Sequence, residues 1–318
     1  MSFVKMILLA GTCMALAVPA EAAISGYGEL YGGIDSGSIS YGRWITGPVS
    51  YQRIFSRDFA PSIIGGSLHA ADILDSGLGV QFDVQGANYF LKKHRIQPYE
   101  EMVSQSTFGL AGHLNRREES YLWGGFASIG KANNSGWVAL GPEVQAYFGN
   151  FTLYSQASYT RSFQGKDCGE GAFSVHTGAR YFLSDHLAFS GGLGAAISDY
   201  DDTGKTSGDR AGEIGHTGML QWDVAAEYLF GASPFSLFAT YRGDRQLWRG
   251  DYPTSYVSIL TRQWKASNQF LVGVRLYLGQ NSLIENERKG AGLNDYNPFF
   301  GAQPSFADHD RDYYGPPI

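Results

Sequence analysis

The sequence is poor in cysteine, in charge and in long apolar runs, and each shortage excludes a class of protein. Two cysteines occur among 318 residues, which excludes a fold held together by disulfides. Charged residues make up only 17% of the chain and the net charge is −6, so a broad nucleic-acid-binding surface is not expected. No apolar run reaches the roughly 18 residues that a transmembrane helix requires.

Glycine and aromatic residues are what the sequence has in abundance. It contains 42 Gly, 20 Tyr, 20 Phe and 6 Trp. Aromatic residues favour strands, and glycine suits tight bends and close backbone approach. The composition therefore indicates many strands rather than helices.

The N-terminus has the features of a secretory signal peptide. Lys5 precedes the uncharged apolar segment Met6 to Val18, and Ala20-Glu21-Ala22 fits the small-x-small cleavage rule. We expect residues 1–22 to be removed, which places the mature N-terminus near Ala23 and leaves Cys168 as the single cysteine. No motif surrounds Cys168, so a catalytic thiol is not expected there.

Twelve segments alternate between apolar and polar residues and are predicted to be strands. They are 25–35, 62–73, 78–89, 105–114, 120–130, 137–148, 151–162, 171–183, 187–198, 217–230, 235–245 and 267–278. The connections between them alternate in length. The short ones are 74–77, 115–119, 149–150, 184–186 and 231–234, and the long ones are 36–61, 90–104, 131–136, 163–170, 199–216 and 246–266.

This alternation predicts an all-β, up-and-down antiparallel transmembrane β-barrel of about 12 strands, with short turns at one end and long loops at the other. A soluble sandwich has Greek-key crossings and no reason to alternate loop length. Helical segments between the strands are missing from the sequence pattern, which argues against a parallel α/β fold.

The two faces of the predicted strands differ in the way that a membrane barrel requires. In 217–230, for example, Leu220, Trp222 and Val224 share one face, and Asp223 and Glu227 share the other. The apolar face suits lipid, and the charged face would line the lumen. The inward ionisable candidates are Glu29, Asp83, Glu143, Arg180, Asp223, Glu227, Arg242 and Arg275. Such charges either pair with one another to hold the wall or line a solute path.

Two further patterns concern the barrel wall. Eight aromatic residues lie beside short turns or at the end of the last strand and predict an interfacial girdle. They are Phe148, Phe151, Tyr181, Phe182, Tyr228, Phe230, Phe235 and Tyr277. If Phe230 faces Phe235 across the turn 231–234, Asp223 opposes Arg242. Closure of the last strand on the first brings Arg275 near Glu29.

The stretches "ISGYGELYGG", "RYFLSDHLAFSGGLG", "AEYLFGASPFSLFATYRGD" and "NQFLVGVRLYLGQ" resemble the outer-membrane β-barrel proteins of Gram-negative bacteria, and are broadly porin-like. The resemblance covers 23–279. It implies a bacterial outer-membrane location and contact with outer-membrane lipid and lipopolysaccharide. It also implies insertion by the barrel assembly machinery, whose signal the segment 271–278 resembles, although this segment ends in Leu and does not end the chain.

Residues 280–318 are rich in Asn, Asp, Pro and Gly. With an even number of strands, this tail would be periplasmic. Its composition favours a disordered or weakly docked extension. The alternative is a segment that docks at the periplasmic mouth through Tyr296, Phe299 and Phe300.

Catalytic and metal-binding patterns are weak. Ser174 and His176 share one strand face, as a hydrolase would require, but this face is predicted to point into the lumen rather than toward lipid. Asp185 and His186 fall in a short periplasmic turn, and His309 lies in the tail. We therefore predict no catalytic residues, no metal and no cofactor.

The sequence thus favours a monomeric outer-membrane channel for passive diffusion of small hydrophilic solutes. The first alternative is a non-conducting structural or adhesive barrel, with its lumen filled by side chains or by the tail. An outer-membrane lipid hydrolase is a distant third.

Overall fold

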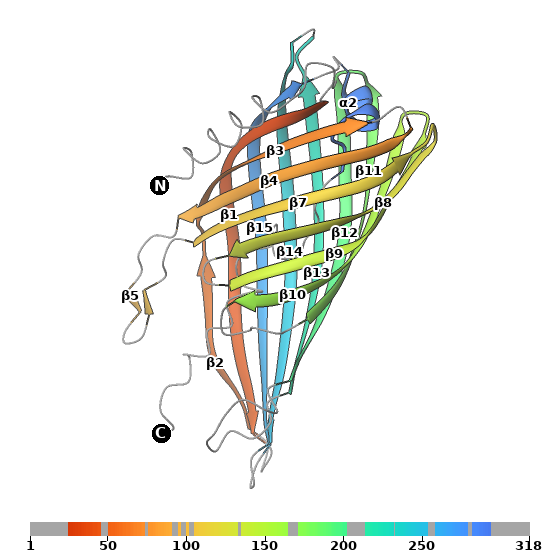
Figure 1. Cartoon of the computed structure of the whole chain (residues 1–318). Coiled ribbons are helices and arrows are strands. Elements are labelled where there is room, and N and C mark those ends of the chain that lie inside the picture. Colours follow the sequence, from red (N-terminus) through yellow and green to blue (C-terminus); the bar gives the residue numbers. More distant parts are fainter. Residues whose placement is uncertain are drawn as a thin grey trace.

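The structure, a computed structural model, is a closed antiparallel β-barrel with one short helix at its turn end (Figure 1). It describes residues 25–45, 50–73, 76–90, 95–96, 100–101, 105–132, 135–164, 171–201, 214–231, 233–253, 258–278 and 282–293. The predicted signal peptide 1–22, Cys168, His309 and the tail beyond Leu293 lie outside these residues.

The wall is built from long strands that follow one another in chain order. They are β1 (Ser25–Ile45), β2 (Ser50–Phe59), β3 (Ser62–Ile73), β4 (Leu78–Phe90), β7 (Gln105–Arg117), β8 (Tyr121–Ala132), β9 (Ser135–Phe148), β10 (Phe151–Gln164), β11 (Gly171–Ser184), β12 (Leu187–Asp201), β13 (Ile214–Leu229), β14 (Phe235–Pro253) and β15 (Ser258–Leu278). A separate small hairpin joins β5 (Arg95–Ile96) to β6 (Glu100–Glu101), and the helix is α2 (Leu283–Lys289).

Twelve strand positions close the barrel. The sheet has thirteen strands, but β2 and β3 pair with successive parts of the same edge of β1 and so occupy one position. Each remaining strand pairs antiparallel with its neighbour in sequence, and β15 pairs with β1 along 20 residues from Gly26↔Leu278 to Ile45↔Ile259. The β15–β1 pairing closes the ring, which is a condition for crossing a membrane with strands, and among the described strands of the wall only β2 has an edge without a partner strand.

All twelve predicted strands are present and the short turns lie where they were predicted, but the predicted bounds of the long connections are wrong. Within 36–61, β1 continues to Ile45 and β2 returns alongside it, and within 246–266, β14 and β15 extend to Pro253 and from Ser258. The loop 199–216 is shortened in the same way by β12 and β13, and 90–104 contains the small hairpin β5–β6. The strands continue beyond the segments in which apolar and polar residues alternate. Outside the lipid a strand needs no apolar face, because the hydrogen bonds between strands are made by the backbone.

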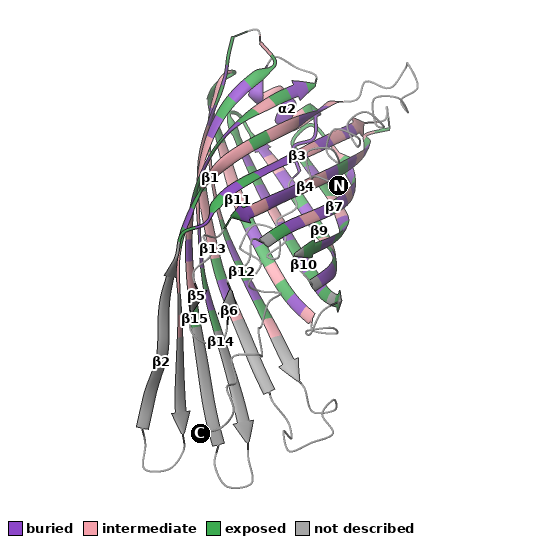
Figure 2. Ribbon diagram, turned by 90° about the vertical axis from the view of Figure 1, so that its left-hand side faces the viewer, coloured by how far each residue is buried: buried purple, intermediate pink, exposed green. Residues whose placement is uncertain are grey.

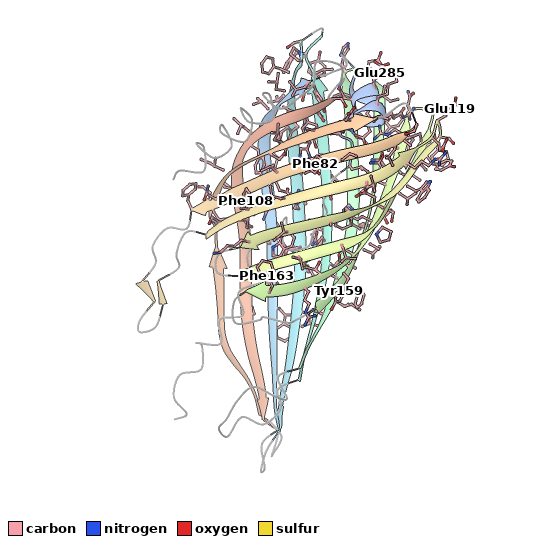
Figure 3. All side chains as sticks on the ribbon, viewed as in Figure 1. Phe82, Phe108, Glu119, Tyr159, Phe163 and Glu285 are labelled. Atoms are coloured by element: carbon pink, nitrogen blue, oxygen red, sulfur yellow. The ribbon has the colours of Figure 1, made fainter. Side chains whose placement is uncertain are left out.

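The two surfaces of the wall differ sharply in exposure. Outward side chains of β12 are apolar and open, with Leu193 and Ile197 exposed to 64% and 65%. Inward side chains such as Gln81, Gln145 and Thr160 are polar and buried. Figure 2 shows this alternation of buried and exposed residues along the strands, and Figure 3 shows outward aromatic side chains such as Phe82 and Tyr159. An apolar exterior around a polar interior is the arrangement of a barrel in lipid.

The aromatic girdle is only partly as predicted. Phe148, Phe151, Tyr181, Tyr228, Phe230 and Phe235 are exposed on the outer wall beside the short turns. Phe182 and Tyr277 are instead buried on the inner side. Their strand neighbours Tyr181 and Leu276 point outward, so the period-2 alternation places Phe182 and Tyr277 inside.

The first part of the tail is more ordered than its composition predicts. Residues 282–293 enter the turn end of the barrel, where α2 lies (Figure 1). Leu283 packs among Tyr27, Phe182, Leu229 and Tyr277. Burial of these apolar side chains offsets the cost of ordering the segment. Within the described part of the chain, no helix is long and apolar enough to cross a membrane.

Candidate functional site: the barrel lumen

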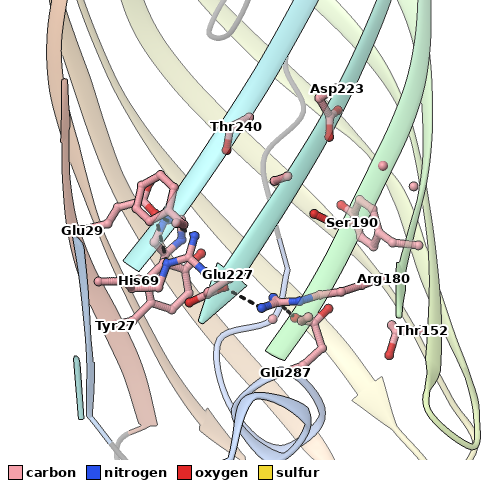
Figure 4. Close-up of a pocket in the computed structure, with 18 of the residues that line it drawn as sticks. Tyr27, Glu29, His69, Thr152, Arg180, Ser190, Asp223, Glu227, Thr240 and Glu287 are labelled. Carbon is pink, nitrogen blue, oxygen red and sulfur yellow. Dashed lines mark hydrogen bonds and ion pairs between the residues drawn. The ribbon is translucent and has the colours of Figure 1, made fainter. Parts of the chain in front are cut away.

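A polar cavity of about 240 Å³ lies inside the barrel (Figure 4). Its wall comes from β1, β3, β4 and the strands β10 to β15, and its floor comes from the tail residues Asn286, Glu287, Ala291 and Gly292. Six of the eight predicted inward charges line it, namely Glu29, Arg180, Asp223, Glu227, Arg242 and Arg275. The other two, Asp83 and Glu143, are buried in the inner wall.

One chain of ion pairs crosses the barrel near the cavity floor. Arg275 Nη2 lies 2.8 Å from Glu29 Oε2, and Arg275 Nη1 lies 2.7 Å from Glu227 Oε2. Arg180 Nη2 approaches the same Glu227 oxygen at 2.6 Å, and Arg180 Nη1 reaches Glu287 Oε2 of α2 at 2.9 Å. We call these five residues, Glu29, Arg275, Glu227, Arg180 and Glu287, the arginine ladder. It connects β1, β15, β13 and β11 to the tail.

Glu227 is the centre of the arginine ladder. Besides the two arginines on Oε2, its Oε1 accepts hydrogen bonds from Ser236 Oγ at 2.6 Å and Tyr277 OH at 2.7 Å. Burial of a carboxylate costs less free energy when its oxygens accept hydrogen bonds and contact cations in this way. The ladder therefore neutralises most of the charge near the floor.

The strand register places Asp223 opposite Arg242, as predicted, and Asp223 also contacts a third residue, His176. Asp223 and Arg242 are directly opposed on β13 and β14, as the turn 231–234 predicts. Asp223 Oδ1 also lies 3.5 Å from Nε2 of His176, on β11. Gly192 lies between Asp223 and His176 on β12, and a Cβ there would come within 2.8 Å of both side chains. The contact across β12 thus depends on a glycine.

A second network lies on β3, β4, β7, β9 and β10, and we call it the histidine chain. It runs from Ser67 through His69, Asp83, His113 and Glu143 to Tyr154. Ser67 Oγ is 2.7 Å from His69 Nε2, and His69 Nδ1 is 2.9 Å from Asp83 Oδ1. His113 Nε2 is 3.0 Å from Asp83 Oδ2 and its Nδ1 is 2.9 Å from Glu143 Oε2, to which Tyr154 OH donates at 3.4 Å.

The two networks meet at Tyr27. The Tyr27 ring stacks on the ring of His69, a member of the histidine chain, with 4.3 Å between the ring centroids. The guanidinium of Arg275, a member of the arginine ladder, lies 4.4 Å from the centroid of the same Tyr27 ring. The alternation of the sequence predicts Asp83 and Glu143 as inward charges, whereas His69 and His113 were not among the predicted inward residues. His69 could have been found, because it is directly opposed to Asp83 across the short turn 74–77. His113 pairs across a long connection whose length does not fix the register.

The tail closes the cavity through backbone contacts made by inward glutamines. Gln81 Nε2 donates to Leu293 O at 2.7 Å, and Leu293 N donates to Gln81 Oε1 at 3.2 Å. Gln145 Nε2 donates to Gly292 O at 3.0 Å. Leu293 is completely buried, in a cluster with Leu122, Tyr147 and Tyr154.

Contacts at the turns hold the helical part of the tail. Leu283 N donates to Asp185 O at 2.8 Å, in the turn between β11 and β12. Arg117, at the end of β7, donates to the carbonyl oxygens of Arg288 and Gly290. Arg288 in turn donates to the carbonyl oxygens of Gly149 and Phe151, at the turn between β9 and β10. The segment 282–293 is thus fixed at several points around the mouth.

The residues considered for catalysis do not form a nucleophilic pair. Ser174 Oγ is 2.5 Å from Ser158 Oγ, whereas His176 faces Asp223. Both Ser174 and His176 are on the inner side of β11, where they alternate with the exposed Phe173, Val175 and Thr177. Over the described ranges, no group of three or more His, Cys, Asp or Glu side chains is arranged to hold a metal ion.

Comparison with known proteins gives matches to solved structures only. No protein family matches the chain, and no curated protein sequence does. An outer membrane channel from Pseudomonas putida F1 is 14% identical, with 80% of this chain and 97% of that chain covered and a TM-score of 0.46. A KdgM porin solved in complex with disordered oligogalacturonate is 8% identical, with 76% and 98% covered and a TM-score of 0.37. A Pseudomonas aeruginosa FadL homologue is 10% identical, with 79% and 90% covered and a TM-score of 0.39.

The first of these structures is described as an outer membrane channel and the second as a porin, and nothing about the function of this chain follows from likenesses of such low identity. The closed twelve-position barrel of this chain, with its exposed apolar exterior and buried polar interior, has by itself the architecture of an outer-membrane β-barrel.

Proposed function

We propose that this protein is an outer-membrane channel for small hydrophilic solutes, with the lumen cavity as the path. The observation that carries the proposal is a polar cavity enclosed by a barrel whose exterior is apolar. A lumen with unfilled polar space can hold water and hydrated solutes, whereas a purely structural barrel of this size could be filled by side chains. We place the short turns and the tail in the periplasm.

Because the charged residues near the cavity floor are paired, we expect the net charge there to be small. In the arginine ladder, each guanidinium lies between two carboxylates, and the excess is a single negative charge, because Arg180 and Arg275 face Glu29, Glu227 and Glu287. Farther from α2, Asp223 and Arg242 both line the cavity (Figure 4 labels Asp223). We expect ion preference to be set mainly by these two residues.

Conduction requires the tail to move. Residues 286, 287, 291 and 292 form the cavity floor, so a solute that enters from the loop end meets the docked segment. The docking contacts are hydrogen bonds, ion pairs and two buried leucines, which can be broken without unfolding the wall. The docked state is then the closed state of the channel.

The same docked tail also favours the first alternative, a barrel that does not conduct. In that case residues 282–293 are a permanent part of the core and fill the turn end of the lumen. The two functions differ in one measurable property, which is whether weakening the tail contacts opens a path for ions.

Single-channel recording in planar bilayers tests this directly. We compare the full-length protein with Leu293→Asn, which places an amide in the buried cluster of Leu122, Tyr147 and Tyr154. Glu285→Gln is the matched control, because Glu285 lies on α2 and pairs with the exposed Lys289 of the same helix. We expect Leu293→Asn to increase the open probability or the conductance over both the wild type and Glu285→Gln.

Folding of each variant is checked first by the shift in electrophoretic mobility that heating produces in folded barrels. If folded wild type and folded Leu293→Asn both fail to conduct, the channel proposal is wrong and the non-conducting barrel is favoured. If the wild type conducts and Leu293→Asn changes nothing, the lumen is open but the tail does not close it.

A further inference from the structure

Three basic side chains lie on the outer wall at a common height. Lys131, Arg161 and Arg245 are exposed. Each lies ten residues after an exposed aromatic residue that begins its strand at the turn end. The three pairs are Tyr121 and Lys131, Phe151 and Arg161, and Phe235 and Arg245. Ten residues of a tilted strand span about 25 Å, which is the height of the apolar band of such barrels. The three cations therefore lie at the membrane interface on the loop side.

Other outward residues near Arg245 also have an interfacial character. Trp222, Tyr241 and Trp264 lie on the neighbouring outer wall, and Tyr241 OH donates to Asn268 Oδ1 at 2.8 Å. Aromatic residues with a polar edge concentrate where acyl chains meet headgroups. Arg245 is thus at the level of lipid headgroups rather than at mid-membrane.

A hollow of about 360 Å³ opens in the outer wall beside Arg245. The strand register explains it. One row across four strands is Leu220, Arg245, Ala266 and Ser38, and the next row toward the loops is Gly218, Leu247, Trp264 and Ser40. Ala266 on β15 and Ser38 and Ser40 on β1 have small side chains, which leave the hollow open. The larger side chains of Leu247, Trp264 and Arg245 surround it. Its surface is mostly apolar, and two basic residues contribute to its lining, Arg245 on the outward row and Lys265 between the outward residues Trp264 and Ala266.

The Arg245 side chain is held in place beside the hollow. Its guanidinium lies 5.0 Å from the Trp222 ring centroid, and Nη1 donates to Asp244 O at 2.7 Å and to Ser267 O at 3.3 Å. Trp222 is itself fixed over Gly243, where a Cβ would come within 2.4 Å of the indole. The cation is therefore positioned by its neighbours, which reduces the entropy that a bound anion would have to remove.

We propose that this hollow binds a phosphate-bearing lipid of the outer leaflet, with the phosphate on Arg245 and an acyl chain along Leu220, Leu247 and Trp264. An arginine presents several donors to phosphate oxygens, and such hydrogen bonds are strongest when partly desolvated, as at the edge of a bilayer. A saturated acyl chain matches the apolar lining. The site rests on the proposed orientation, with the loops on the outer side of the membrane, but it does not need an open lumen, so it stands whether or not the channel conducts.

Native mass spectrometry of the full-length protein in detergent tests the site. The probes are lipid A carrying two phosphates and the same acylated disaccharide without phosphates. The key variant is Arg245→Gln, and Arg161→Gln is the matched control because Arg161 has the same charge and height but does not line the hollow. Ser38→Leu fills the hollow without changing a charge.

We expect the wild type to retain lipid A at least about tenfold more strongly than the dephosphorylated probe, which corresponds to one good charge-assisted contact. Arg245→Gln and Ser38→Leu should each weaken lipid A binding by about this factor, and Arg161→Gln by less than about twofold. Equal losses in Arg245→Gln and Arg161→Gln would mean general attraction to a basic ring and would overturn the site. Unchanged binding in Ser38→Leu would overturn the acyl-chain position.

Discussion

Arg275 and Glu29 hold together the seam at which the barrel closes. They are directly opposed on β15 and β1, and Arg275 contacts Glu29 Oε2 through Nε at 3.1 Å and Nη2 at 2.8 Å. The two residues are 246 positions apart in the chain, so this contact exists only once all the intervening strands are in place. The third nitrogen, Nη1, reaches Glu227.

Removing the arginine from this seam should cost more stability than removing its partner. Arg275→Met leaves Glu29 and part of Glu227 without their cation, and we expect a loss of about 3 kcal/mol in the free energy of unfolding. Glu29→Gln leaves Arg275 paired with Glu227, and we expect about 1.5 kcal/mol. Urea unfolding in lipid vesicles, followed by electrophoretic mobility, measures both. A larger loss in Glu29→Gln would contradict the central position of Arg275.

Ion preference should respond in opposite directions to the two cavity residues beyond the ladder. Arg242→Ala removes positive charge from the lumen and should shift the reversal potential toward cation preference, and Asp223→Ala should shift it toward anion preference. Recordings under a salt gradient in planar bilayers measure the shift. Thr240→Ala is the control, because Thr240 lines the same cavity without charge. Unchanged reversal potentials in both charge variants would remove these residues from the solute path.

Docking of the tail should depend on Gln81. Gln81→Ala removes both hydrogen bonds to the Leu293 backbone and the contacts with Asp83 at 2.9 and 3.0 Å. We expect amide hydrogens in 290–293 to exchange about tenfold faster, since each lost bond contributes on the order of 1 kcal/mol. Gln85→Ala is the matched control on the same strand, because Gln85 lines the cavity. Equal exchange in both variants would show that Gln81 does not hold the tail.

The proposed orientation predicts which basic residues a protease can reach on intact cells. Trypsin should cut near Lys92 or Lys205, in the connections β4–β5 and β12–β13. It should spare Arg288, whose carbonyl oxygen accepts a hydrogen bond from Arg117 at the turn end. Peptide mapping after digestion of intact and of permeabilised cells gives the comparison. Cleavage at Arg288 in intact cells would reverse the orientation.

The sequence determined the strands and their faces because both depend on a local period of two. Alternation in 187–198 separates Phe189, Leu193 and Ile197 from the small inward residues, and lipid on one side of the wall requires this. A short turn also fixes the register of the strands that it joins. Phe230 N does donate to Phe235 O across the turn, and Asp223 is opposed to Arg242 for that reason.

Only the tertiary structure decided where the inward side chains find their partners. Asp223 approaches His176 across the intervening strand β12, and His113 joins Asp83 to Glu143 across β4, β7 and β9. Each contact depends on side-chain conformation and on the curvature of the closed wall, which a period of two does not encode. The docking of 282–293 could not be predicted from the sequence for the same reason. A polar, glycine-rich composition predicts disorder for an isolated segment, but the finished barrel supplies the glutamines and the apolar cluster that order it.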